Sequence, residues 1–246
     1  MIDLNCDMGE GMGNDEQIMP YISSANIACG YHAGDETTIW ETTRLAIKHG
    51  VSVGAHVSFL DKMNFGRTEI NIPAGEVYEL VTQQLIILYE ITGFLGTRIQ
   101  HVKPHGALYN MSAKDPALAK VIAESVKDFD KDLLLFGLSG SHSIREAKQA
   151  GLRTVNEVFA DRSYQDDGTL TPRSLPGALI SDKDISLNQV MQLINQQQVM
   201  SLQGKIMPMA ADTICIHSDG ADAAGFAKAI HEAITKEGIL IKSPAT

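Results

Sequence analysis

Cysteine is scarce in this 246-residue chain, and basic residues are outnumbered. The three cysteines, Cys6, Cys29 and Cys215, are odd in number and far apart, which excludes a disulfide framework and a CxxC zinc pattern. We interpret all three as packing residues. Lys and Arg total 20 against 30 Asp and Glu, a net charge of −10, which argues against a nucleic-acid-binding surface.

Long hydrophobic runs are also missing. No apolar stretch approaches the ~18 residues that a membrane span requires, and the acidic opening segment MIDLNCDMGEG is unlike a secretory signal. We therefore expect a cytoplasmic protein that has neither a membrane nor a nucleic acid as its partner.

Several widespread catalytic and nucleotide-binding motifs are absent as well. The chain has no GxxxxGK[ST] phosphate-binding loop, no GxSxG nucleophile turn and no HExxH zinc motif. Gly9, Gly11 and Gly13 follow the first predicted strand, but their spacing does not fit GxGxxG. Any nucleotide must therefore be held without these loops.

Short apolar runs alternate regularly with helical segments, and no Pro/Ser-rich linker divides the chain. The predicted strands cover residues 2–5, 25–29, 51–55, 99–102, 133–136, 154–159 and 213–216. Seven strands alternating with helices predict a parallel α/β architecture, which we expect to form a single domain over residues 1–246. A closed or nearly closed (β/α) barrel fits the length, and a doubly wound open sheet is the alternative.

Capping signals locate the helices, which are predicted over residues 36–49, 73–92, 116–127, 143–150, 186–198 and 222–236. Gly50 and Gly93 are expected to end the first two helices, and Ser143 and Ser186 each begin a capping-box pattern. Two segments interrupt the alternation. Residues 199–209 are typical of a hairpin, and the long polar loop 163–180 is typical of a lid or binding segment.

Within most strands one face is apolar, and the other is small or polar and ends in an ionisable side chain. The carboxyl ends of barrel strands form the active-site mouth, so these side chains should converge there. They are Asp7, His32, His56, Lys103, His105 and His217. Each alone has an ordinary structural explanation. Burying all of them together costs several kcal/mol for every unpaired charge, which favours a function.

Three short segments carry most of the chemistry. Asp7 and Glu10 flank a glycine turn, which suits metal ligation or acid/base work, and an acidic turn without function explains that segment equally well. Lys103 and His105 flank Pro104 and present a cation beside a proton shuttle. Arg162 is suited to holding a carboxylate in a bidentate contact.

Six segments together resemble the LamB/YcsF family, that of the A subunits of bacterial 5-oxoprolinases. They are DLNCDMGE (3–10), SANIACGYHAGD (24–35), GAH (54–56), HVKPHGALYN (101–110), EVFADR (157–162) and DTICIH (212–217). The sequence departs from the family in two places. The loop after Glu10 is short, and Val57 stands where relatives often have proline.

The resemblance implies an irregular seven-stranded (β/α) barrel, similar to the barrels of the glycoside hydrolase/deacetylase superfamily. It also implies ATP-dependent hydrolytic opening of 5-oxoproline (pyroglutamate) to L-glutamate, in a complex with two further subunits, B and C. The chain would then be an ATP-hydrolysing amidohydrolase that acts on a cyclic amide, with Mg²⁺ accompanying the ATP.

This chemistry suggests roles for the clustered side chains. We assign Lys103 to the phosphorylated amide oxygen and Asp7 or His105 to the base that activates water, with Arg162 anchoring the substrate carboxylate. The other substrate-binding candidates are Glu10, His32, His56, Asp161 and His217. Two further classes of function stay open. One is a metal-dependent hydrolase or deacetylase with Asp7, His32 and His56 as ligands, and the other is a non-catalytic subunit that binds a small molecule for a partner.

Overall fold

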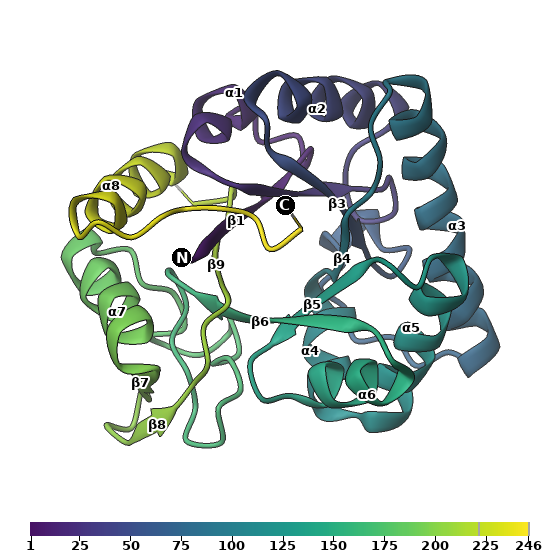
Figure 1. The fold of residues 1–246 in the computed structure, drawn as a ribbon. Helices are drawn as coiled ribbons and strands as arrows, with labels where there is room; N and C mark the ends of the chain where they lie inside the picture. The colour runs from purple at the N-terminus through teal and green to yellow at the C-terminus, as the bar shows by residue number, and fades with distance from the viewer. Residues whose placement is uncertain (221, 246) are drawn as a thin grey trace.

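The computed structural model describes residues 1–220 and 222–245, and a parallel barrel lies at its centre (Figure 1). The barrel strands are β1 (Asp3–Met8), β2 (Ser24–Ala28), β3 (Ser52–Val57), β4 (His101–Pro104), β5 (Leu134–Leu138), β6 (Arg153–Phe159) and β9 (Thr213–Ile216). Neighbours pair in the order β1-β2-β3-β4-β5-β6-β9, and β9 pairs with β1, so the sheet closes. The predicted seven-stranded barrel is confirmed, and the open-sheet alternative is wrong.

Helices surround the barrel on the outside (Figure 1). They are α1 (Asp15–Ile18), α2 (Glu36–His49), α3 (Ala74–Phe94), α4 (Gly106–Lys114), α5 (Pro116–Phe129), α6 (His142–Ala150), α7 (Lys183–Gln196) and α8 (Ala223–Lys236), with 3-10 turns at Met19–Tyr21 and Lys62–Asn64. The predicted hairpin is confirmed as the antiparallel pair β7 (Gln198–Met200) and β8 (Ile206–Pro208). No helix in the described part of the chain has the length and hydrophobicity of a membrane span.

The two faces of the strands explain the closed architecture. Apolar side chains such as Leu4 and Val53 belong to the hydrophobic core, whereas the alternate positions form a polar layer inside the barrel. There Asn26 Nδ2 donates to Asn5 Oδ1 at 2.7 Å, and His101 Nε2 lies 2.8 Å from Asn26 Oδ1. A Cβ at Gly54 would collide with the ring of His101. Glycine at this position therefore makes room for a histidine inside the barrel.

The amino end of the barrel is closed by the C-terminal segment. The Lys242 N–H donates to the Ile2 carbonyl at 3.0 Å, and Ala245 packs against the cluster of Leu134, Phe136 and Val155. Beside this closure, the buried carboxylate of Asp3 accepts hydrogen bonds from three hydroxyls, those of Ser23, Ser24 and Thr213. The carboxyl end of the barrel is left for a functional site.

Two of the predicted caps form as expected. The Asp35 side chain accepts from Thr38 N–H at the start of α2, and Asp115 accepts from Ala117 N–H at the start of α5. The cap predicted at Ser186 is wrong. Helix α7 begins three residues earlier, where Asp182 accepts from two backbone N–H groups. Its carboxylate takes the orphan donors of the first turn.

Three further details differ from the sequence-based expectation. Helix α3 continues through Gly93, and α6 begins at His142, so Ser143 does not cap it. The Ser143 hydroxyl instead donates to Ser112 Oγ at 3.1 Å. Helix α4 was not predicted at all. It follows β4 directly and carries Tyr109 and Asn110 toward the barrel mouth, where both line a cavity.

Candidate active site

A cavity of about 380 Å³ opens at the carboxyl ends of the barrel strands. Five of the six side chains expected to converge there line it, namely Asp7, His56, Lys103, His105 and His217. The sixth, His32, is buried beside them, and its ring stacks on that of His105 with the centroids 3.8 Å apart. Parallel strands in register thus bring their terminal side chains to one mouth.

Lys103 is the centre of a buried charge cluster. Its Nζ lies 2.8 Å from Asp7 Oδ1, 2.9 Å from Glu157 Oε1 and 3.1 Å from Cys215 Sγ. Burial by itself would lower the pKa of Lys103, but Asp7, Cys215 and Glu157 raise it well above its ordinary value. The ammonium group is therefore a permanent positive charge at the cavity wall.

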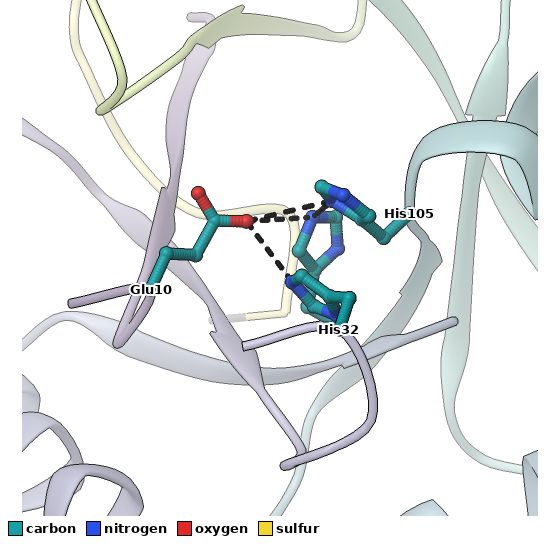
Figure 2. Close-up of side chains that lie close together, drawn as sticks. Glu10, His32 and His105 are labelled. Carbon is teal, nitrogen blue, oxygen red and sulfur yellow. Dashed lines mark hydrogen bonds and ion pairs between the residues drawn. The ribbon is translucent and has the colours of Figure 1, made fainter. Parts of the chain in front are cut away.

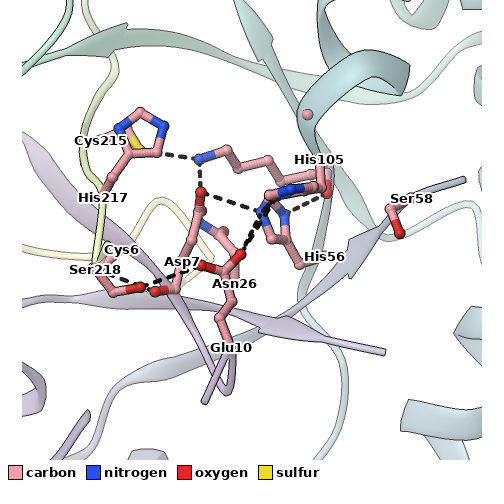
Figure 3. Close-up of polar contacts among 12 residues, drawn as sticks. Cys6, Asp7, Glu10, Asn26, His56, Ser58, His105, Cys215, His217 and Ser218 are labelled. Carbon is pink, nitrogen blue, oxygen red and sulfur yellow. Dashed lines mark hydrogen bonds and ion pairs between the residues drawn. The ribbon is translucent and has the colours of Figure 1, made fainter. Parts of the chain in front are cut away.

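Asp7 is held as a carboxylate by the same contacts, seen among the residues of Figure 3. Its Oδ1 also accepts from Asn26 Nδ2 at 2.9 Å, and its Oδ2 lies 3.2 Å from His56 Nε2. Burial alone would raise the pKa of Asp7, but His56 and Lys103 lower it well below the ordinary value. Asp7 therefore stays ionised at neutral pH and can accept a proton or a ligand.

A second cluster joins Glu10 to the histidines (Figure 2). Glu10 Oε1 lies 3.1 Å from His32 Nε2, 3.4 Å from His105 Nδ1 and 3.8 Å from His56 Nε2. Burial and then the charge of Asp7 raise the pKa of Glu10 to about 7. Burial lowers the pKa of His32 to about 4 and that of His105 well below its usual value. These two rings are therefore neutral at pH 7.

His217 is oriented by Asp161, the carboxylate that follows β6. Its Nδ1 lies 2.9 Å from Asp161 Oδ1, and its backbone N–H donates to Asp161 Oδ2 at 3.1 Å. Burial by itself would raise the pKa of Asp161, but His217 lowers it below its usual value. The His217 ring also stacks on Phe159, with the centroids 5.5 Å apart. The pair fixes the ring of His217 at the cavity wall.

Arg162 lines the cavity, but its donors are engaged by the backbone. Its Nε donates to the Ala178 carbonyl at 3.2 Å, and its Nη2 donates to the Thr171 carbonyl at 2.6 Å. These bonds tie the polar loop 163–180 to the barrel, and residues 170–174 of that loop line the cavity. The role of Arg162 as a substrate anchor stays a prediction.

Two arginines that the sequence analysis did not single out also line the cavity. Arg67 and Arg173 both contact the carboxylate of Asp219, and Arg173 Nη1 does so at 3.4 Å. Both side chains are partly exposed, by 37% and 27%. They lie in separate loops far apart in the sequence, so no local motif could have indicated that they meet.

The structure also adds Glu157 and Cys215 to the site. The sequence left the face of Glu157 ambiguous, and the interpretation of Cys215 as a pure packing residue is wrong because its sulfur contacts Lys103. A signal was present, since Cys215 alternates with Thr213 and His217 on the inward face of β9. Burial raises the pKa of Cys215 well above its usual value, so it remains a thiol.

Potential metal-ligating atoms form two groups among the described residues. Glu10, His32, His56 and His105 form the first, and Asp7, Cys215 and His217 form the second, each with its atoms within 4.8 Å of one another. The ligand set predicted from the sequence, Asp7, His32 and His56, is divided between the two groups. Imidazoles with a carboxylate are a donor set that suits transition metals rather than Mg²⁺.

Comparison with known proteins gives relatives that extend over the whole chain. The A subunit of a 5-oxoprolinase from Brevibacillus brevis is 49% identical over 98% of this chain and 96% of its own length. The corresponding 5-oxoprolinase protein from Bordetella pertussis is 48% identical over 98% of each chain. The crystal structure of a lactam utilization protein from Thermus thermophilus has a TM-score of 0.91 at 41% identity, over 98% of each chain.

A more distant likeness concerns the fold alone. A family 4 carbohydrate esterase from Streptomyces lividans has a TM-score of 0.51 at 12% identity, over 98% of this chain and 90% of its own. This agrees with the deacetylase-like barrel that the family resemblance implied. The sequence profile of the LamB/YcsF family matches residues 2–246. With the full-length relatives, this match shows that the chain belongs to the LamB/YcsF family.

Proposed function

We propose that this chain is the A subunit of a cytoplasmic 5-oxoprolinase, an enzyme that hydrolyses 5-oxoproline to L-glutamate with consumption of ATP. Relatives that are nearly half identical over the whole length carry this name. The observation that carries the proposal is the buried Lys103 cluster at the wall of a 380 Å³ cavity. A cavity of that size is in the range that holds small molecules.

The proposed reaction needs activation because a five-membered lactam is a stable amide. ATP would supply the activation by phosphorylating the amide oxygen of the lactam. Water then adds to the ring carbon, the C–N bond breaks and its nitrogen takes a proton, and a second water hydrolyses the remaining acyl phosphate. The balance is one lactam, one ATP and two waters giving glutamate, ADP and phosphate.

The site offers one group for each demand of this sequence. Lys103 places a positive charge where negative charge develops on the amide oxygen. Asp7, which is ionised and lines the cavity, is the first choice for the base that takes a proton from water, and His105 is the second. The choice falls on Asp7 because its carboxylate is bound by Lys103 and so lies beside the reacting oxygen.

Anion binding is assigned to the basic rim of the cavity. Arg67, Arg173 and Lys114 line it together with Arg162, so the substrate carboxylate and the phosphates of MgATP both meet positive charge there. Arg67 and Arg173 share one carboxylate, that of Asp219. Two guanidinium groups around one acid leave donors for an incoming anion.

Dependence on subunits B and C follows from the missing phosphate-binding loop. A chain without one of the common nucleotide motifs is expected to hold ATP only in part, with a partner completing the site. Glutamate release from 5-oxoproline and ATP is therefore measured first with the isolated chain, then with B and C added. We expect little or no turnover alone and full turnover on mixing. Full activity of the isolated chain would contradict the dependence on partners.

A pair of variants separates catalysis from passive binding. Lys103→Met should abolish glutamate release in the assembled complex, whereas Lys48→Met, at an exposed position on α2, should leave it unchanged. Normal turnover by Lys103→Met would indicate a non-catalytic role for this chain. Glutamate release without ATP would instead favour a metal-dependent hydrolase.

A further inference from the structure

Two of the clustered imidazoles have one ring nitrogen committed as a donor. His56 Nδ1 lies 3.0 Å from the backbone carbonyl of Lys103, and His105 Nε2 lies 2.9 Å from that of Phe65. A carbonyl oxygen only accepts, so each of these nitrogens carries the hydrogen. In the neutral ring, the other nitrogen of each histidine then presents a lone pair.

The third imidazole is fixed in the same way through a hydroxyl. His32 Nδ1 lies 2.9 Å from Ser58 Oγ, and that hydroxyl donates to the Phe59 carbonyl at 3.0 Å. Its hydrogen is therefore used, and the oxygen accepts from His32 Nδ1. His32 Nε2 is left with a lone pair. Outer partners that fix the tautomer of each ring in this manner are typical of histidines that bind a metal.

The three lone pairs point to one place, which they share with a carboxylate (Figure 2). His56 Nε2 and His105 Nδ1 are only 2.8 Å apart, and Glu10 Oε1 lies 3.1–3.8 Å from all three nitrogens. Four acceptors this close repel one another unless positive charge lies between them. A single proton bridges two of the four atoms, whereas a metal cation satisfies all of them.

We propose that Glu10, His32, His56 and His105 form a binding site for one divalent transition-metal ion such as Zn²⁺. In a tetrahedral centre with bonds of ~2.1 Å, ligand atoms lie ~3.4 Å apart, and the separations here bracket that value. All four side chains are buried, so the ligands are already gathered and shielded from water. His56 and His105 line the cavity, which gives the ion access to substrate.

This ligand set replaces the one predicted from the sequence. Asp7 is left outside it because its Oδ1 is bound by Lys103 and Asn26. A bound metal would also remove His105 as a base, since its lone pair becomes a ligand, and would leave Asp7 in that role. Metal binding needs neither ATP nor a partner protein, so its failure would leave the proposed 5-oxoprolinase activity untouched.

Metal binding is tested on the isolated full-length chain. Chelator-treated protein is titrated with Zn²⁺ by calorimetry and with Co²⁺ by visible absorption, and the metal content is measured after gel filtration. We expect one equivalent per chain, Co²⁺ d–d bands of a low-coordinate site, and a melting temperature that rises with free Zn²⁺. Glu10→Gln and His32→Gln should each lower the affinity at least about tenfold.

Three controls sharpen the result. His231→Gln changes a histidine on α8 that contacts only the Tyr21 carbonyl and ring among the described residues, and it should bind as the wild type does. Asp7→Asn should retain one equivalent, which separates this ligand set from the earlier one. If His32→Gln fails to fold, the nearly isosteric Glu10→Gln decides alone. Less than one equivalent in the wild type, or unchanged affinity in Glu10→Gln, would overturn the site.

Discussion

Strand β1 offers an internal comparison, because it carries a buried carboxylate near each end. Asp3 is 1% exposed and Asp7 is 3% exposed, yet their neighbours differ in charge. Asp7 Oδ1 lies 2.8 Å from the ammonium of Lys103, whereas Asp3 is surrounded by the hydroxyls of Ser23, Ser24 and Thr213. The same substitution, Asp to Asn, should therefore change the stability of the protein in opposite directions.

For Asp7→Asn the lost attraction dominates. Unit charges 2.8 Å apart attract by about 6 kcal/mol at an effective dielectric constant of about 20. Relief of desolvation offsets part of this, and Glu157 still faces Lys103 at 2.9 Å. Since removing one partner of a buried ion pair typically costs about 3–5 kcal/mol, we expect a loss near the lower end, about 3 kcal/mol.

For Asp3→Asn the cost of burying a charge is removed. Burial, only partly offset by hydrogen bonds from Ser23, Thr213 and Ser24, raises the pKa of Asp3 from 3.8 to about 6. At about 1.4 kcal/mol per unit, the ionised side chain destabilises the folded state by roughly 3 kcal/mol at pH 7. Asp3→Asn should therefore be more stable than the wild type at pH 7, by up to that amount.

The pH dependence has a sign that can be checked. Between about pH 4 and pH 6 the folded protein holds a proton on Asp3 that the unfolded chain has lost, so this residue makes stability fall as pH rises through that window. The fall should vanish in Asp3→Asn. The pKa of Asp7 is lowered, so its contribution is complete above about pH 4 and is lost only in stronger acid.

Urea unfolding of the isolated chain at pH 5 and pH 7 measures these differences, and glutamate release by the assembled complex measures function. We expect Asp7→Asn to remain folded and to lose at least about 10²-fold in turnover, the range of general acid–base catalysis. Asp3→Asn should keep its activity, because it lies at the opposite end of the barrel. Stability changes of the same sign in both variants, or near-normal turnover by Asp7→Asn, would refute the reasoning.

Three other outcomes follow from individual contacts. Lys103→Met leaves Asp7 and Glu157 buried without their cation and should lower the free energy of unfolding by about 3–5 kcal/mol; a Lys103→Met, Glu157→Gln double variant that recovers none of this would contradict the pairing. Asp182→Ala removes the cap of α7 and should cost about 1 kcal/mol in urea unfolding, with turnover unchanged. Arg162→Lys weakens the bonds to the Thr171 and Ala178 carbonyls, so loop 163–180 should be cleaved faster in limited proteolysis; a raised KM with unchanged cleavage would instead indicate direct contact with the substrate.

Local periodicity determined much of the barrel. Side chains alternate along a strand, and parallel barrel strands all end at the same rim, so the positions of Asp7, His56, Lys103 and His217 followed from the sequence. The caps at Asp35 and Asp115 were equally readable, because a helix N-cap depends on residues that are adjacent in the chain.

Ser186 and Gln189 show where local reasoning fails. Their spacing fits a capping box, but the fold gives them other partners. Ser186 Oγ donates to the Ala160 carbonyl at 2.8 Å, and Gln189 Nε2 donates to the carbonyls of Phe159 and Arg162. Both side chains thus tie α7 to the segment after β6. A tertiary hydrogen bond to a buried carbonyl outweighs a local cap that Asp182 already provides.

The charge state of the site was decided only by the tertiary structure. Glu157 meets Lys103 across 54 positions of sequence, and Arg67 meets Arg173 around Asp219, because closure of the barrel and folding of its loops bring them together. The pKa of Glu10 rises to about 7 through burial, which no composition reveals. The sequence determined which chemical groups reach the mouth, whereas the closed barrel determined which of them are paired, ionised or left with an unshared lone pair. Those properties depend on distance and on exclusion of water.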